Sequence, residues 1–254
     1  MIHFVGAGPG AADLITLRGH RALLEADIVV YAGSLVNPEL LQYVKETCTT
    51  HNSAGMTLEE VMHVMVEGYR QGLFVVRLHT GDPSLYGAIK EQMDRLDAVN
   101  IPYTVVPGVS SFLGAAASLQ AEFTLPAVSQ SLILTRMEGR TPVPAKEAIE
   151  KFAEHQTSMA IFLSASMLET LAARLMAGGY AADTPAALVY KATWPDEKIV
   201  CTTVNALPKA ARDAGISKTA LVFVGGFLGS EYERSKLYDP SFSHEFRKGK
   251  GSCV

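Results

Sequence analysis

Short apolar runs in the first 120 residues end at a glycine, and a segment with helical spacing follows each of them. These runs are Ile2–Val5 before Gly6, Val75–Leu78 before Gly81, and Tyr103–Val106 before Gly108. Buried strands that alternate with helices form a parallel sheet, and ligands bind at the carboxyl edge of such sheets. The pattern therefore predicts an α/β fold for the first half of the chain.

Helix signals fill the intervals between these strands. Thr57 and Glu60 form a capping box, Asn37-Pro38 is a typical helix start, and Ser84 can cap a helix after the Gly81 loop. Further helices are expected from Leu17 and from Ser110, and a further strand at Ile28–Tyr31. Strand and helix thus alternate up to about residue 120.

The second half has a different strand spacing, which predicts a sheet with antiparallel members. Its expected strands are Ser131–Thr135, Ala160–Leu163, Ala187–Tyr190, Ile199–Thr203 and Ala220–Val224, with helices from about Ala145, over Ser166–Ala177 and over Asn205–Ala214. Glu122–Ser129 has no helical period and indicates a linker. We therefore expect an N-terminal α/β domain at 1–121, a C-terminal α/β domain at 122–235 and a polar tail at 236–254.

Composition excludes several classes of protein. With 48 % hydrophobic residues the chain can fill a large core, and a formal net charge of -4 provides no global basic field for nucleic acid. Cys48, Cys201 and Cys253 are too far apart for a CxxC pair, and no cluster of metal ligands is visible. With no basic leader and no apolar run of about 20 residues, we expect a soluble, cytoplasmic protein without membrane contact.

The glycines at 6–10 match the dinucleotide fingerprint, because Gly6-Ala7-Gly8-Pro9-Gly10-Ala11 follows a strand. An NAD-dependent Rossmann dehydrogenase is therefore one alternative. Two features oppose it: the second strand ends at Tyr31 without an acidic residue for a ribose, and Pro9 lacks an N–H donor. The other interpretation is a tight turn that packs a strand against a helix.

Two more loops are expected at the same sheet edge. Thr80–Pro83 offers backbone amides and the Asp82 carboxylate, which either binds a ribose or amino group or merely caps the next helix. Pro107–Ser111 adds hydroxyl groups at another helix start. Together the three loops predict a pocket for a nucleoside-like ligand rather than for a bare phosphate.

These motifs resemble the successive signatures of the tetrapyrrole (corrin and porphyrin) methylases, which use S-adenosylmethionine. The matching stretches are Val5–Gly10 with Leu14–Leu17, the Gly81-Asp82-Pro83 loop, and Pro107–Ser111. Within that family, the stretches most like the precorrin-4 C11-methyltransferases of cobalamin synthesis are Tyr31–Leu35, Arg77–Gln92, Val128–Gln130 and Thr135–Pro142. The resemblance extends to about Gly226.

The resemblance implies two α/β domains with a ligand cleft between them, the class III methyltransferase fold, and a homodimer. In this family the N-terminal glycine loop faces the tetrapyrrole rather than a dinucleotide. The donor site carried over by motif consists of Pro9, Gly81, Asp82, Leu85, Ser110 and Ser111, with Leu163 and Ala192 from the second domain. The implied reaction is S-adenosylmethionine-dependent methylation of precorrin-4, or cobalt-precorrin-4, at C11.

A tetrapyrrole acceptor carries several carboxylates, so its site needs basic side chains. Arg136 and Arg140 are the leading candidates, followed by Arg18 and Arg77, although each is also consistent with an ordinary surface charge. His79 and Glu138 are weaker candidates for handling a proton. The catalytic residue itself is not identified, and no bound metal is expected.

Other functions remain open at this point. The same scaffold can methylate another ring carbon of a corrin precursor or of uroporphyrinogen. A non-catalytic tetrapyrrole carrier would leave the donor loops without a use, and a dehydrogenase would need the missing ribose acid.

Overall fold

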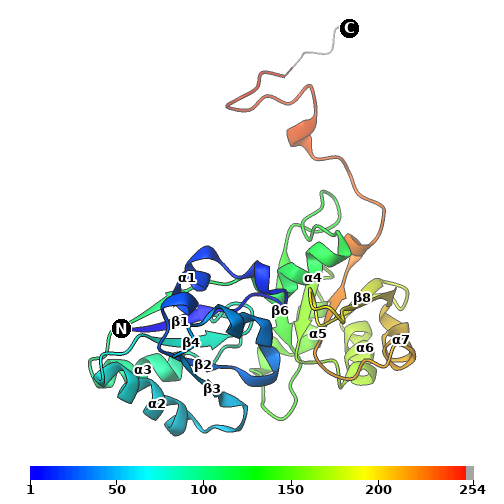
Figure 1. Cartoon of the computed structure of the whole chain (residues 1–254). Helices are drawn as coiled ribbons and strands as arrows, with labels where there is room; N and C mark the ends of the chain where they lie inside the picture. The colour runs from blue at the N-terminus through cyan, green and yellow to red at the C-terminus, as the bar shows by residue number, and fades with distance from the viewer. Residues whose placement is uncertain (250–254) are drawn as a thin grey trace. The chain divides into compact units, whose positions relative to one another are not determined.

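The computed structural model describes residues 1–249, and these form two compact units (Figure 1). Met1–Ala115 and Lys191–Glu197 make up the first unit, while Ala116–Tyr190 and the chain from Lys198 onward make up the second. The domain division expected from the sequence did not place segment 191–197 in the first unit. The expected boundary after residue 121 stays a prediction, and Cys253 and the last residues of the expected tail lie outside the described residues.

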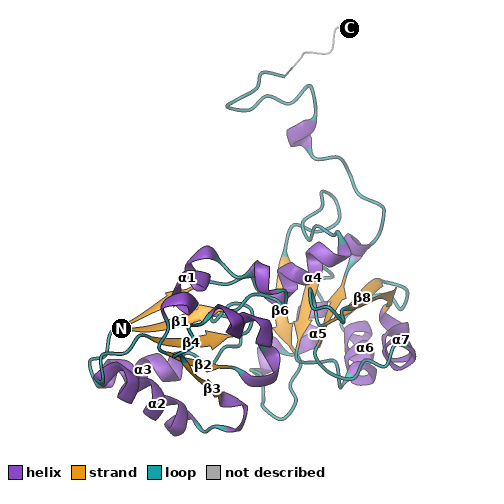
Figure 2. Ribbon diagram, in the orientation of Figure 1, coloured by secondary structure: helices purple, strands orange, loops and turns teal. Residues whose placement is uncertain are grey.

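The first unit contains a five-stranded sheet with the order β3-β2-β4-β1-β5, and every neighbouring pair is parallel. Its strands are β1 (Ile2–Gly6), β2 (Ile28–Tyr31), β3 (Thr49–Asn52), β4 (Val75–His79) and β5 (Tyr103–Val106). Its helices are α1 (Leu17–Glu25), α2 (Leu58–Arg70), α3 (Lys90–Ala98) and the start of α4 (Ser111–Leu119). The parallel α/β arrangement predicted for the first half is confirmed (Figure 2).

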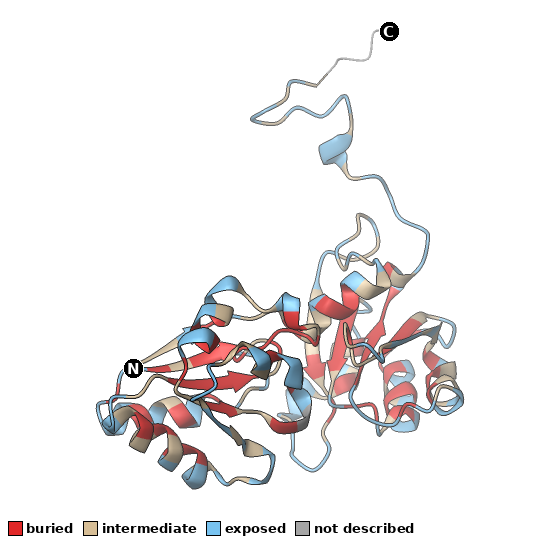
Figure 3. Ribbon diagram, viewed as in Figure 1, coloured by how far each residue is buried: buried red, intermediate tan, exposed pale blue. Residues whose placement is uncertain are grey.

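Helices cover this sheet on both faces. Alternate strand residues point to opposite sides, and in β1, β2 and β4 apolar residues lie on both sides. Leu78 packs with Leu23 of α1 on one face, whereas Val75 packs with Met65 of α2 on the other. These side chains are fully buried, and Figure 3 shows the buried residues concentrated in the strands. Each such side chain contributes about 1.5–3 kcal/mol to folding.

The second unit contains a mixed sheet with the order β6-β7-β10-β8-β9. β6 and β7 are parallel, whereas β10 is antiparallel to both of its neighbours and β8 is antiparallel to β9. The strands are β6 (Leu132–Arg136), β7 (Ser158–Phe162), β8 (Pro185–Tyr190), β9 (Lys198–Thr203) and β10 (Ala220–Val224). The antiparallel members predicted for this half are therefore confirmed.

One face of the second sheet is covered by helices, and its core includes Ile161 with Leu171 of α6 and Leu207 of α7. The helices of this unit are α5 (Ile149–Ala153), α6 (Leu168–Ala177) and α7 (Leu207–Asp213). On β10, Phe223 has its ring stacked 6.0 Å from that of Phe123. Short 3-10 turns occur at Ala12–Leu14, Gly33–Leu35, Pro38–Tyr43, Ser53–Gly55, Ala145–Glu147, Val204–Ala206, Gly226–Leu228 and Lys236–Tyr238.

Two local predictions need correction. β3 was not expected, because Thr49–Asn52 contains no large apolar residue and forms a largely exposed edge strand. The helix expected directly after Ser84 begins only at Lys90, since Tyr86 and Ala88 adopt left-handed backbone conformations with φ of 58° and 50°. By contrast, the Thr57 capping box is present, with both reciprocal hydrogen bonds made.

None of the helices within residues 1–249 is both long and apolar enough to cross a membrane.

Candidate functional site

Two of the expected loops are joined at the carboxyl edge of the first sheet. The Gly8 N–H donates to the Gly81 carbonyl at 3.2 Å, and the Gly81 N–H donates to the Gly8 carbonyl at 2.8 Å. Gly81 has a φ of 59°, which favours glycine because it has no Cβ. The loop after β4 is thereby held against the N-terminal glycine loop.

The third loop approaches the same point so closely that side chains are excluded. A Cβ on Gly108 would lie 2.2 Å from the Gly81 carbonyl oxygen, and one on Gly6 would lie 2.6 Å from the Gly108 Cα. Gly6 and Gly108 are therefore needed for packing between the backbones of the loops. The three loops form one connected backbone surface at the strand ends.

Asp82 connects the second and third loops. Its Oδ2 accepts from the Gly108 N–H at 2.9 Å, and its Oδ1 accepts from the Ser84 N–H at 2.9 Å and from the Ser84 hydroxyl. Burial opposes ionisation, but the bonds from Ser84 and Gly108 outweigh it and hold the pKa of Asp82 below its ordinary value. The carboxylate is thus charged at neutral pH and fixed in orientation.

Segment 84–89 follows Asp82 in a strained conformation. Tyr86 and Ala88 are left-handed, and a Cβ on the intervening Gly87 would lie 2.2 Å from the Pro83 carbonyl oxygen. Non-glycine residues persist in such conformations only where their surroundings fix them, and they cluster at functional sites. Nothing in the sequence marks these two positions, since neither Tyr nor Ala favours a positive φ.

A segment from late in the chain braces the glycine loop. The Ala11 N–H donates to the Thr193 hydroxyl at 2.9 Å, and the Gly10 carbonyl accepts from the buried Asn37 side-chain amide at 2.9 Å. A Cβ on Gly10 would lie 2.2 Å from Cδ1 of Trp194. No local pattern in the sequence marks this contact, because Gly10 and Trp194 are far apart in the chain.

The structure brings most of the expected donor-site residues into one unit. Those in the first unit are Pro9, Gly81, Asp82, Leu85, Ser110, Ser111 and Ala192. Ala192 was expected in the second domain but belongs to segment 191–197, where it is 5 % exposed. Leu163, in the second unit, follows β7 with a φ of 55° and is 64 % exposed. The role of these residues as a donor site stays a prediction.

Arg77 does not have the exposure that contact with a large acceptor requires. Its side chain is buried, with Nε donating to Gln92 Oε1 at 3.2 Å and Nη1 donating to the Val30 carbonyl at 3.1 Å. Burial lowers the pKa of Arg77 to about 10, so the group is still charged at neutral pH. We therefore remove Arg77 from the candidate carboxylate contacts.

The other candidate arginines differ from one another. Arg136 donates to the carbonyls of Met137, Thr141 and Pro142, at 3.1, 3.3 and 2.8 Å, and so holds the loop after β6 in shape. Arg140, at the tip of that loop, is exposed, as is Arg18 at the start of α1. Arg136 was predicted as a carboxylate contact, but its guanidinium is bonded to these carbonyls, so we reassign it to ordering the loop. The two exposed arginines remain predicted contacts for a polyanionic acceptor.

Neither proton-handling candidate has suitable surroundings. His79 is 3 % exposed, and its Nε2 has no hydrogen-bond partner within residues 1–249. Burial and the charge of Arg77 lower its pKa to about 3. Glu138 pairs with Arg174, which holds the pKa of that carboxyl below its ordinary value. A neutral imidazole and a paired carboxylate are poorly suited to exchange a proton near pH 7.

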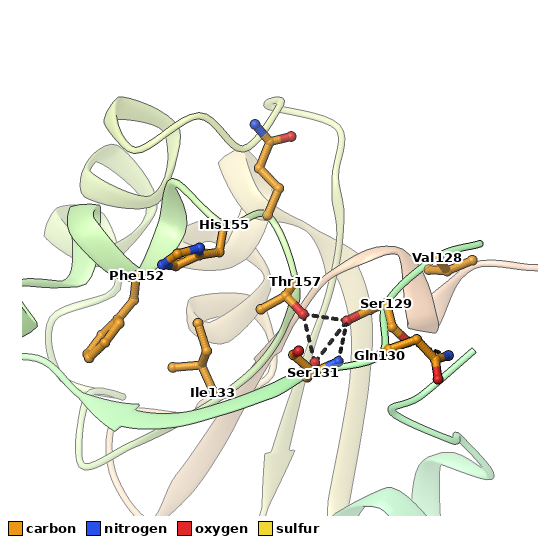
Figure 4. Close-up of a pocket in the computed structure, with 9 residues that line it drawn as sticks. Val128, Ser129, Gln130, Ser131, Ile133, Phe152, His155 and Thr157 are labelled. Atoms are coloured by element: carbon orange, nitrogen blue, oxygen red, sulfur yellow. Dashed lines mark hydrogen bonds between the residues drawn. The ribbon is translucent and has the colours of Figure 1, made fainter. Parts of the chain in front are cut away.

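A cavity of about 550 Å³ lies in the second unit, at the amino ends of β6 and β7 (Figure 4). The hydroxyls of Ser129 and Thr157 lie within hydrogen-bond distance of each other and of the Ser131 carbonyl there, and each hydroxyl donates its single proton to one of these acceptors. The lining contains none of the predicted site residues. Within residues 1–249, no group of three or more His, Cys, Asp or Glu side chains is placed to hold a metal ion.

The chain is similar to known methyltransferases over nearly its whole length. Cobalt-precorrin-4 C(11)-methyltransferase of Methanocaldococcus jannaschii is 54 % identical over 96 % of this chain and 95 % of its own length. The protein of the same name from Priestia megaterium is 47 % identical over 98 % of both chains. A solved structure described as the cobalamin biosynthetic enzyme cobalt precorrin-4 methyltransferase superposes with a TM-score of 0.88 at 46 % identity, over 90 % of this chain and 96 % of that one.

The family-level match covers most of the chain. Residues 1–208 match the sequence model of the Tetrapyrrole (Corrin/Porphyrin) Methylases, a range that includes all three loops and the brace at 191–197. The fold class expected from the sequence is confirmed by the superposed methyltransferase structure. The chain belongs to the tetrapyrrole (corrin/porphyrin) methylases.

Proposed function

We propose that this protein is an S-adenosylmethionine-dependent C-methyltransferase that methylates C11 of precorrin-4, in its metal-free or cobalt form, in cobalamin biosynthesis. The observation that carries the proposal is the 54 % identity, over nearly the full length of both chains, to a protein named for that reaction. A dehydrogenase is disfavoured, since the strand end at Tyr31 offers no acid to a ribose.

The residues at the sheet edge fit a nucleoside-bearing donor. The missing side chains of Gly6 and Gly108 let the backbones of the three loops pack together, which gathers their polar groups at one place on the sheet edge. Asp82 accepts three hydrogen bonds from the protein, and a carboxylate has about four acceptor positions, so one remains for a ribose hydroxyl or an amino group. Leu85 and Ser111, both half-buried, lie on the second and third of these loops.

The donor supplies a methyl group on a sulfonium, which can be transferred to carbon without a covalent intermediate on the enzyme. The protein's contribution is then to place donor and acceptor within about 3–3.5 Å of one another and to exclude water. The hydrogen bonds that Asp82 accepts from Gly108 and Ser84 fix the loop after β4 before a ligand binds. Less conformational entropy is therefore lost on binding.

The acceptor is a macrocycle with several carboxylates. Arg140 and Arg18 are exposed and available to bind such groups, while Arg136 orders the loop that carries Arg140. Although the protein is net acidic, Arg140 and Arg18 thus provide local positive charge for an anionic substrate.

One incubation tests donor, reaction and position together. The purified protein is mixed with S-adenosylmethionine labelled in its methyl group and with precorrin-4, with and without cobalt, and the product is read by mass spectrometry and carbon NMR. We expect one labelled methyl at C11. A label at another carbon would correct the position within the family, and binding of NADH without methyl transfer would restore the dehydrogenase.

We also propose that the enzyme is a cytoplasmic homodimer, as the family resemblance implies. Light scattering coupled to size-exclusion chromatography measures the mass directly, and a monomer mass at micromolar concentration would refute the dimer.

A further inference from the structure

A buried polar chain connects the centre of the first sheet to the strained segment 84–89. Arg77 Nη1 donates to the carbonyl of Val30 in β2, and Arg77 Nε donates to Oε1 of Gln92 in α3. The Nε2 of Gln92 then donates to the Ala88 carbonyl at 3.2 Å. Arg77 is 7 % exposed and Gln92 is 4 % exposed, so water does not compete effectively for these groups.

The chemistry of the groups fixes the direction of this chain. A guanidinium can only donate, so the Gln92 amide must turn its oxygen toward Arg77. Its NH₂ group consequently faces the Ala88 carbonyl, where it can only donate. The buried cation thus determines which way the amide points, and the amide in turn binds the backbone of segment 84–89.

The bond from Gln92 to Ala88 supports a residue with an unfavourable backbone conformation. Ala88 is left-handed, and its carbonyl receives a side-chain donor from the residue four positions later, at the start of α3. At the other end of the loop, Asp82 is bonded to Gly108. The stretch from Asp82 to Ala88, which includes the predicted donor contact Leu85, is therefore anchored at both ends.

We propose that Arg77 and Gln92 are positioning residues for the methyl-donor site, which they support by holding segment 84–89 in its strained conformation. This inference rests on the proposed function and assigns Arg77 a role other than binding the acceptor. Arg77 is a buried cation with no carboxylate partner in the part of the chain that the structure describes, and such a group is costly to folding. Its retention here is explained by the conformation that it imposes on the loop.

The test uses a substitution that separates the two bonds of Gln92. Gln92→Glu keeps an acceptor for Arg77 and adds an ion pair, but it removes the donor to Ala88 and places a carboxylate oxygen against that carbonyl. We expect a folded protein with at least a 10-fold rise in the KM for S-adenosylmethionine and less than a 3-fold change in kcat. Gln92→Asn, which keeps the amide but cannot span both partners, should show the same split.

A matched control lies on the same helix. Arg95→Gln removes the exposed ion pair between Arg95 of α3 and Glu59 of α2, and it leaves the buried chain intact. Its KM for the donor should match that of the unaltered enzyme. An equal rise in the KM of Arg95→Gln would show that loosening α3 is enough to weaken donor binding, and it would overturn the inference.

Calorimetry with S-adenosylhomocysteine separates failure of the inference from failure of the proposed function. If the unaltered enzyme does not bind this product, the proposed function fails. If it binds and Gln92→Glu binds equally well, only the positioning role is wrong.

Hydrogen exchange of the unaltered protein provides a measurement that depends on no variant. Saturating S-adenosylhomocysteine should slow exchange of the amides at 84–89 by at least 5-fold. Unchanged exchange there would overturn the inference even if the Gln92 variants do not fold.

Discussion

Oδ2 of Asp82 lies 2.9 Å from the backbone nitrogen of Gly108, and this bond joins the loops that follow β4 and β5. The residues are 26 positions apart in the chain but belong to neighbouring loops at one sheet edge, since β4 and β5 both flank β1. Asp82 does not cap a helix, because α3 starts only at Lys90, and its binding of a ribose or amino group stays a prediction.

Replacing Asp82 should weaken donor binding. Asp82→Ala removes three accepted hydrogen bonds and the remaining acceptor position, so we expect at least a 10-fold loss of S-adenosylhomocysteine affinity by calorimetry. Asp27→Asn is the matched control, because Asp27 also binds a backbone N–H, that of Phe74, before β4 begins. The control should lower the melting temperature without changing affinity; unchanged affinity in Asp82→Ala would contradict the assignment.

The loop after β6 offers a pair of variants that separates shape from contact. Arg136→Ala loses bonds to three carbonyls and should lower the free energy of unfolding by about 1–3 kcal/mol. Arg140→Ala should leave the free energy of unfolding within about 0.5 kcal/mol but raise the KM for precorrin-4 roughly 10-fold. Urea unfolding and initial rates check both, and equal substrate KM in Arg140→Ala and the unaltered enzyme would refute the contact.

The buried imidazole of His79 should make stability fall in acid. Burial and the charge of Arg77 lower its pKa to about 3 from an ordinary value of 6.5. Between these values the unfolded chain binds one proton more than the folded protein, so the free energy of unfolding decreases as pH falls. The slope approaches about 1.4 kcal/mol per pH unit.

His79→Leu should remove this contribution between pH 6.5 and 3. Urea unfolding at pH 7.5, above both pKa values, gives the reference for each protein, and the same measurement at pH 5.5 and 4.5 gives the slope. If the free energy of unfolding changes with pH equally in the variant and the unaltered protein, His79 binds its proton equally in the folded and unfolded states.

The brace on the glycine loop can be followed through the single tryptophan of the chain, Trp194. Gly10→Ala would place a Cβ 2.2 Å from the indole, so we expect a red-shifted emission and a loss of about 1–3 kcal/mol in stability. At Gly55 a Cβ meets no atom of residues 1–249 within 4 Å, so Gly55→Ala should change neither property. An unshifted emission in Gly10→Ala would show that the indole does not pack on Gly10.

Patterns local in sequence predicted much of this fold. Strand ends at Gly6, Gly81 and Gly108 were readable because a glycine breaks an apolar run, and the capping box at Thr57 was readable because its residues are three apart. The loops could be placed together because parallel strands share one carboxyl edge.

What could not be predicted depends on distant contacts. The left-handed backbone of Tyr86 and Ala88 has no sequence signature, and it converts an expected helix start into a loop. The return of Ala192 to the first unit depends on packing between Gly10 and Trp194. Arg77 was a candidate contact for an acceptor carboxylate, but mid-strand charges can be buried when neutral acceptors such as Gln92 are supplied by another element.

The position of β10 has a consequence for synthesis of the protein. This strand is the last of the ten within residues 1–249 but lies in the middle of its sheet, between β7 and β8. The first sheet is complete once Val106 has left the ribosome, whereas the second has no centre until Val224 has emerged. A nascent chain arrested before residue 220 therefore exposes open edges on β7 and β8, and chaperones should bind it until the final strand is inserted.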